Sequence, residues 1–120
     1  LGIEQWDFIS GAGTGGTLMG LSEFVTSRSI ASRLLHRVIQ VAPQEGAKTH
    51  GIQGINDGED FLLDRNKVPE QILVSTNASI REAQDFARTH GLLIGISSGA
   101  NLVAARAYLQ KNLYRNVVTL

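Results

Sequence analysis

The sequence has no cysteine, which excludes a disulfide framework and a thiolate zinc site within these residues. It also has no surplus of charge, because eleven basic residues balance eleven acidic ones. A protein that binds the phosphate backbone of nucleic acid needs a basic surface. No apolar run approaches the ~18 residues of a membrane span, and no signal peptide pattern is present. We therefore expect a cytoplasmic protein with neither nucleic acid nor a membrane as a partner.

What is present is enough apolar material for a core. The 120 residues are 42% hydrophobic, which suits one small domain. The sequence opens without Met, almost directly into an apolar segment, and closes on the β-branched run NVVTL. We expect residues 1–120 to form one partial domain, a fragment of a longer chain that is truncated at both ends.

Apolar segments alternate with segments of helical periodicity along the chain. Strands are predicted at Trp6–Ser10, Arg37–Ala42, Glu70–Ser75 and Val117–Leu120. Helices are predicted at Thr17–Thr26, from the Ser79/Glu82 capping box to Gly91, and at Ser97–Asn112. Leu92–Ile96 is a strand or a buried connector, and Gln44–Pro69 is a long loop of the kind that usually has a function. The alternation predicts an α/β fold with a parallel sheet and helices on its faces.

The stretch SGAGTGGT, Ser10–Thr17, places four glycines between the first strand and the first helix. Gly11, Gly13 and Gly16 fit the dinucleotide fingerprint G-x-G-x-x-G. That fingerprint also wants an acidic residue at the end of the next strand. Ala42 and Pro43 stand there instead, so the dinucleotide interpretation has little support.

Two other interpretations apply to the same glycines. A nucleoside-triphosphate P-loop needs a lysine directly after the last glycine, and Thr17 occupies that place. A single phosphate monoester fits better, because successive N–H groups from Gly13 to Thr17 can converge on its oxygens. The dipole of the following helix and the hydroxyls of Thr14 and Thr17 would add to the attraction. The structural alternative is a glycine-rich turn that only allows close packing of strand and helix.

A second motif, GISSG at Gly95–Gly99, matches the G-x-S-x-G nucleophile elbow. Its acid and histidine partners should follow the serine, and neither follows Gly99 in this sequence. Loops at the carboxyl ends of parallel strands share one edge of the sheet. Ser97 or Ser98 could therefore face a phosphate bound by the first motif. The alternative for both serines is capping of the helix that follows.

Four stretches together resemble the fold-type-II pyridoxal-phosphate enzymes, the tryptophan synthase β-like superfamily. They are FISGAGTGGTLMG, RVIQVAP, HGIQGI and GLLIGISSGANLVAA. Within that family the sequence is most similar to cysteine synthase (O-acetylserine sulfhydrylase) and cystathionine β-synthase. The resemblance implies the carboxyl-terminal part of such an enzyme, with a three-layer Rossmann-like fold. The implied reaction forms cysteine from O-acetylserine and sulfide, with a small amino acid as substrate and a homodimer as the full-length state.

The alternatives are cystathionine β-synthase, a serine/threonine dehydratase-like lyase, or a non-catalytic module that keeps the fold. The resemblance assigns the cofactor phosphate to five residues of the first motif: Gly13, Thr14, Gly15, Gly16 and Thr17. It assigns Ser97 to the pyridine nitrogen, where a neutral hydroxyl would leave the ring a milder electron sink than a carboxylate would.

The resemblance places the Schiff-base lysine in an amino-terminal motif that Lys48, Lys67 and Lys111 do not match. No catalytic residue is therefore predicted here, and the isolated chain is expected to be inactive. The three histidines show no metal-ligand spacing, so no metal is predicted. The family often has GIGAG where this sequence reads GINDG. Because this loop helps to shape the mouth of the active site, the different residues from Asn56 to Asp60 leave the identity of the substrate undetermined.

Overall fold

A computed structural model describes residues 5–27, 34–46, 48–55 and 62–120. Its centre is a sheet of four strands, β1 (Trp6–Gly11), β2 (Leu35–Pro43), β3 (Gln71–Val74) and β4 (Asn116–Val118). The strand order is β3-β2-β1-β4, and every pair is parallel. The predicted parallel sheet is confirmed, with strand ends that differ from the prediction by one or two residues.

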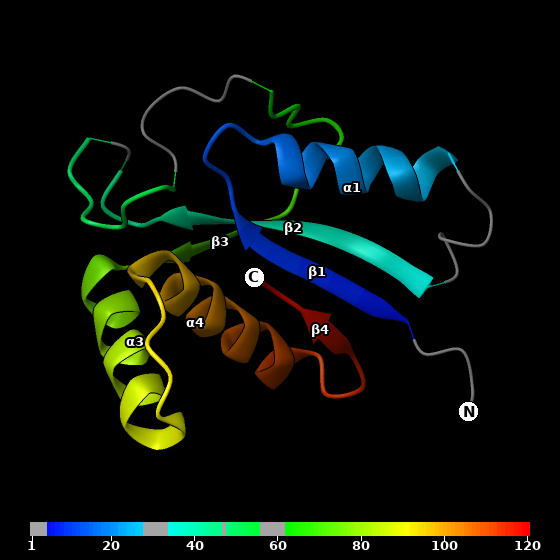
Figure 1. Cartoon of the computed structure of the whole chain (residues 1–120). Coiled ribbons are helices and arrows are strands. Elements are labelled where there is room, and N and C mark those ends of the chain that lie inside the picture. The colour runs from blue at the N-terminus through cyan, green and yellow to red at the C-terminus, as the bar shows by residue number, and fades with distance from the viewer. Residues whose placement is uncertain (1–4, 28–33, 47, 56–61) are drawn as a thin grey trace.

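Helices cover both faces of this sheet, which gives the predicted three layers (Figure 1). Helix α1 (Gly16–Ser27) lies on one face, and α3 (Thr76–His90) and α4 (Ile96–Lys111) lie on the other. Side chains alternate along β1, so Phe8 packs with Leu18 of α1 while Ile9 packs with Ala100 and Ala104 of α4. Among the described residues, no helix is long and apolar enough to cross a membrane.

Helix α3 begins earlier than its predicted capping box. Ser75 is the N-cap, with extended backbone angles, and its hydroxyl accepts a hydrogen bond from Ala78 N–H at 3.2 Å. Ser79 is buried inside the helix, and its hydroxyl donates to the carbonyl of Ser75. Glu82 instead accepts a hydrogen bond from Arg106 of α4 at 2.9 Å. The capping-box prediction is therefore wrong, whereas the predicted end at Gly91, a left-handed C-cap, is confirmed.

The segment Leu92–Ile96 is a connector rather than a strand, since residues 92–95 pair with no strand and Ile96 opens α4. The prediction that a connector here would be buried is wrong, because Leu92 and Leu93 are exposed. It returns the chain along α3 so that α4 starts at the edge of the sheet where the strands end (Figure 1). Close packing of α3 on α4 depends on Gly99. A side chain at that position would overlap the carbonyl oxygen of Ser79.

Candidate functional site

The glycine loop lies at the edge of the sheet formed by the carboxyl ends of the strands, where ligands bind in open α/β folds. Strand β1 ends at Gly11, and the chain then turns through residues 12–15 into α1 (Figure 1). Residues 11–18 line a small cavity of about 200 Å³. Thr14, Gly16 and Thr17 are exposed on the loop, whereas Gly15 is buried.

The start of α1 leaves backbone donors without helical acceptors. The first hydrogen bond of the helix runs from Met19 N–H to Gly15 O at 3.0 Å. The N–H groups of Gly16, Thr17 and Leu18 precede it, and such groups have no acceptor within their own helix. The carbonyl of Thr14 accepts from Leu62 N–H at 3.0 Å. The loop therefore presents N–H donors at the positive end of a helix, an arrangement that binds anions.

The glycines of this loop differ in how much space the surrounding chain leaves for a side chain. Gly15 has a φ of +88°, and an added Cβ would lie 2.9 Å from the backbone nitrogen of Leu63. An added Cβ on Gly13 would lie 3.0 Å from the carbonyl of Gly54. Packing alone thus explains these two positions, in agreement with the structural alternative.

Gly16 is different, because packing within the chain does not require it. The nearest atoms to an added Cβ would be Thr14 Oγ1 at 3.7 Å and Leu62 Cδ1 at 3.8 Å, which are ordinary contacts. Gly16 is exposed beside the free N–H groups. An open glycine at this place leaves room for a group that approaches the backbone closely, so the loop fits a phosphate.

The segment 50–55, HGIQGI, packs against the glycine loop. A side chain on Gly11 would overlap Ile55, whose own side chain is buried in the core. Gly51 N–H donates to Thr76 Oγ1 at 2.9 Å, which holds the segment on the start of α3. The residues Asn56–Asp60, where the sequence differs from the GIGAG of the family, lie outside the described residues. Their influence on the choice of substrate therefore stays a prediction.

Ser97 occupies the start of α4, at the same edge of the sheet. The N-cap of α4 is Gly95, so Ser97 and Ser98 lie inside the first turn rather than at the cap. The capping alternative for these two serines is therefore wrong. Ser97 is half-buried, and its hydroxyl has no hydrogen-bond partner among the described residues. It is free to bind a ligand.

Sequence reasoning missed the residue that joins the two motifs. Asn101, buried on α4, accepts a hydrogen bond from Gly11 N–H at 2.8 Å through Oδ1. It lies four residues after Ser97, and residues four apart share one face of a helix. The GANL sequence around it offered no signal, because an asparagine in a helix has no preferred distant partner.

The acidic residue nearest to the end of β2 has another role. Glu45 Oε1 accepts a hydrogen bond from Thr76 N–H at 2.7 Å, at the start of α3. This bond holds the pKa of Glu45 below its usual value. Ala42 and Pro43 are buried at the strand end. The carboxylate thus caps a helix, and the dinucleotide interpretation gains no support.

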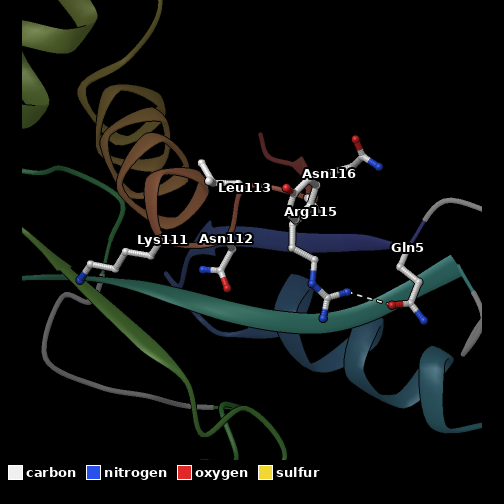
Figure 2. Close-up of a pocket in the computed structure, with 7 residues that line it drawn as sticks. Gln5, Lys111, Asn112, Leu113, Arg115 and Asn116 are labelled. Carbon is white, nitrogen blue, oxygen red and sulfur yellow. Dashed lines mark hydrogen bonds between the residues drawn. The ribbon is translucent and has the colours of Figure 1, made fainter.

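A larger hollow, of about 920 Å³, lies at the opposite end of the sheet (Figure 2). It is lined by the residue before β1 and by the turn from α4 to β4, including Lys111 and Arg115. Arg115 donates to Gln5 Oε1 at 2.9 Å, and its Nε lies 3.6 Å from Asp7 Oδ2. This pocket is at the amino ends of the strands, so it is separate from the glycine loop.

Lys48, Lys67 and the histidines form no further catalytic or metal centre in the described part of the chain. Lys67 pairs with Glu23 of α1 at 3.3 Å, and Lys48 is exposed in the turn after β2. Within the described ranges, no group of three or more histidine, cysteine or acidic residues could hold a metal ion.

The fold and the glycine loop define an α/β protein with backbone N–H donors at one edge of its sheet, and comparison with known proteins gives its family. The model of the pyridoxal-phosphate dependent enzymes matches residues 2–120. The chain belongs to this family, whose cofactor is pyridoxal phosphate, and is related to cysteine synthases and cystathionine β-synthases.

Three relatives illustrate the match. Cysteine synthase B of Campylobacter jejuni is 33% identical over 94% of this chain and 39% of its own length. The O-acetylserine dependent cystathionine β-synthase of Bacillus subtilis is 31% identical over 99% of this chain and 43% of its own length. The crystal structure of the O-acetylserine dependent cystathionine β-synthase from Helicobacter pylori has 28% identity and a TM-score of 0.78, covering 99% of this chain and 40% of that one. The chain thus spans about two fifths of the length of the relatives it matches.

Proposed function

We propose that this chain is the cofactor-binding part of a β-replacement enzyme of the cysteine synthase type. In the proposed reaction, sulfide displaces acetate from O-acetylserine and cysteine is formed. The observation that carries the proposal is the open glycine, Gly16, beside three backbone N–H groups that have no helical acceptor. Because the chain belongs to the pyridoxal-phosphate dependent enzymes, the phosphate that this loop would bind is that of pyridoxal phosphate.

The loop would bind the phosphate of pyridoxal phosphate through its backbone. The N–H groups of Gly16, Thr17 and Leu18 point out of the start of α1, where the helix dipole favours a dianion. The exposed hydroxyls of Thr14 and Thr17 are further donors. Gly13 and Gly15 would act indirectly, because their close contacts with Gly54 and Leu63 keep the loop in this shape.

Ser97 would hold the pyridine nitrogen. When it is bound, pyridoxal phosphate supplies an electron sink to an amino-acid substrate. A serine hydroxyl can hydrogen-bond to a ring nitrogen without fixing a proton there, since it both donates and accepts. This neutral partner suits elimination of a β-substituent better than a carboxylate does, because a carboxylate would favour the protonated ring.

The lysine that binds the cofactor covalently would be supplied by another part of a longer protein. Lys111 lines the hollow at the amino ends of the strands, and Lys67 is paired with Glu23. We further propose that residues 1–120 are one partial domain and that the full-length protein is a cytoplasmic homodimer.

The test places a negative charge on the open side of the loop. The Gly16→Asp variant should keep the fold, because an added Cβ meets only ordinary contacts and an acidic residue is favourable in the first turn of a helix. Its carboxylate would repel the phosphate, so the full-length protein should bind pyridoxal phosphate at least about tenfold more weakly, which equals about 1.4 kcal/mol.

Gly20→Asp is the matched control, because Gly20 lies one turn further along α1 with no atom within 4 Å of an added Cβ. Equilibrium dialysis with pyridoxal phosphate measures the affinity, and circular dichroism verifies the fold. Unchanged affinity in the folded Gly16→Asp protein would exclude the loop as the phosphate site.

A second candidate function is the formation of cystathionine from O-acetylserine. The names of the Bacillus subtilis and Helicobacter pylori relatives favour it. The two reactions share the activated serine and differ in the thiol that replaces its acetate. Product analysis of the full-length protein with O-acetylserine and either sulfide or homocysteine would separate them.

A further inference from the structure

The two motifs of the candidate site meet at the side chain of Asn101. This residue lies on α4 and is only 5% exposed. Its Oδ1 accepts a hydrogen bond from Gly11 N–H at 2.8 Å, and its Nδ2 donates to the carbonyl of Leu120 at 3.0 Å. The amide therefore joins the helix to the last residue of β1 and to the chain that follows β4.

These bonds replace strand pairing where β4 has ended. The pairing of β1 with β4 extends only to Phe8 and Val118, whereas β1 continues to Gly11. Beyond Phe8, side chains bond to that edge of β1. Thr119 Oγ1 donates to Ile9 O at 2.6 Å, and Asn101 accepts from Gly11 N–H. On the β4 side, Asn101 is thus the last partner of β1 before the glycine loop begins.

The same side chain is fixed relative to Ser97. Ser97 lies one helical turn before Asn101 on one face of α4, so the two side chains share a rigid support. The position of α4 is itself constrained by the contact of Gly99 with the Ser79 carbonyl of α3. The hydrogen bond that Gly11 N–H donates to Asn101 therefore sets where the glycine loop starts relative to Ser97.

We propose that Asn101 is a positioning residue that holds the glycine loop and Ser97 in register, so that one cofactor molecule can reach both. The proposal rests on the proposed function, since it needs the phosphate on the loop and the pyridine ring at Ser97. Asn101 touches neither group itself. It acts through Gly11 on one side and through the frame of α4 on the other.

The test is a double-mutant cycle on the apparent Kd for pyridoxal phosphate, measured with the full-length protein. Asn101→Leu removes both hydrogen bonds at similar volume, and we expect it to weaken binding by about tenfold. Ser97→Ala alone should weaken binding, because one hydrogen bond is lost. In the Asn101→Leu background, Ser97→Ala should have almost no further effect, since the hydroxyl is already out of register.

Thr119→Val is the matched control, because it removes the neighbouring bond to β1 from a residue that is not on α4. It should leave the effect of Ser97→Ala intact. Asn101→Ala also removes both hydrogen bonds and should likewise abolish the effect of Ser97→Ala, which keeps the test available if Asn101→Leu does not fold. Circular dichroism of each variant verifies the fold.

The outcomes separate the two proposals. If Ser97→Ala weakens binding equally in all backgrounds, or if Thr119→Val abolishes its effect, Asn101 is not a positioning residue while the proposed function stands. If the unmodified protein does not bind pyridoxal phosphate, or if Ser97→Ala has no effect in it, the proposed site fails and the role of Asn101 fails with it.

Discussion

The phenolic hydroxyl of Tyr108, on α4, donates a 2.6 Å hydrogen bond to Asp7 Oδ2, near the start of β1. Asp7 is completely buried. Arg115 Nε lies 3.6 Å from the same oxygen, and Asp7 Oδ1 has no partner among the described residues. A buried carboxylate with so few partners depends strongly on each of them. Tyr108 therefore fixes α4 to β1 at the end opposite to the glycine loop.

Replacement of Tyr108 by phenylalanine should destabilise the protein. The variant loses a hydrogen bond to a buried charged group, which costs about 1.5–3 kcal/mol. Urea denaturation measures the change in the free energy of unfolding. Tyr114→Phe is the control, because Tyr114 is 97% exposed, and it should shift stability by less than about 0.5 kcal/mol. Equal losses in the two variants would contradict a structural role for the Tyr108 hydroxyl.

The same contact predicts a dependence of stability on alkaline pH. Burial, together with the hydrogen bond to Asp7, raises the pKa of Tyr108 from 10.0 to about 12. The folded state holds the phenolic proton more tightly than the unfolded chain does. The resulting stabilisation is fully present below the unfolded pKa of about 10 and is lost as the pH rises through 12. The difference in tyrosinate absorbance between the protein and its Tyr108→Phe variant reports this ionisation, and a midpoint at 10 would contradict the assignment.

Gly99 should be intolerant of a side chain, although it lies within a helix. An added Cβ would overlap the Ser79 carbonyl and lie 3.1 Å from Ala83 Cβ. Overpacking of this kind costs about 1–3 kcal/mol, so Gly99→Ala should lower the thermal midpoint. Gly20→Ala is the matched control, since nothing lies within 4 Å of its added Cβ, and it should stabilise α1 by about 0.5–1 kcal/mol. Equal midpoints in the two variants would show that α3 and α4 do not need this close approach.

The sequence could predict the strands and the parallel sheet because their signals are local. The apolar run before the glycines and the run RVIQVA become β1 and β2 with only small changes at their ends. The start of α3 shows the limit of such signals. Ser79 and Glu82 have capping-box spacing, but β3 ends at Val74 and the helix begins directly after it. Glu45, 31 residues before Thr76, caps the helix there, and no local pattern contains that contact.

The candidate site divides in the same way. The loop Gly13–Thr17 could be predicted because a phosphate cradle needs glycines between a strand and a helix, all within one short segment. The role of Asn101 could not, because its partners are Gly11, 90 residues before it, and Leu120, 19 residues after it. The different roles of Gly15 and Gly16 also depend on where Leu63 packs, which is a tertiary contact.

Glu45 predicts a dependence of stability on acidic pH. Its carboxylate accepts Thr76 N–H at 2.7 Å, and Thr76 Oγ1 in turn accepts Gly51 N–H at 2.9 Å. The hydrogen bond from the Thr76 backbone lowers the pKa of Glu45 from its usual 4.5. The folded state therefore binds the Glu45 proton less tightly than the unfolded chain does. The stabilisation is fully present above pH 4.5 and is lost as the pH falls through the lower pKa of the folded protein.

Glu45→Gln tests this sign, because glutamine keeps an oxygen acceptor and removes the charge. We expect the protein to be more stable than the variant at pH 7 and the difference to shrink steadily as the pH falls below 4.5. The carboxylate is exposed, so added salt should also reduce the difference at pH 7. Urea midpoints of both proteins from neutral to acidic pH, at low and high salt, measure the effect. A difference that stayed constant over that range would mean that the charge of Glu45 contributes nothing and that Glu45 acts only as a neutral acceptor for Thr76 N–H.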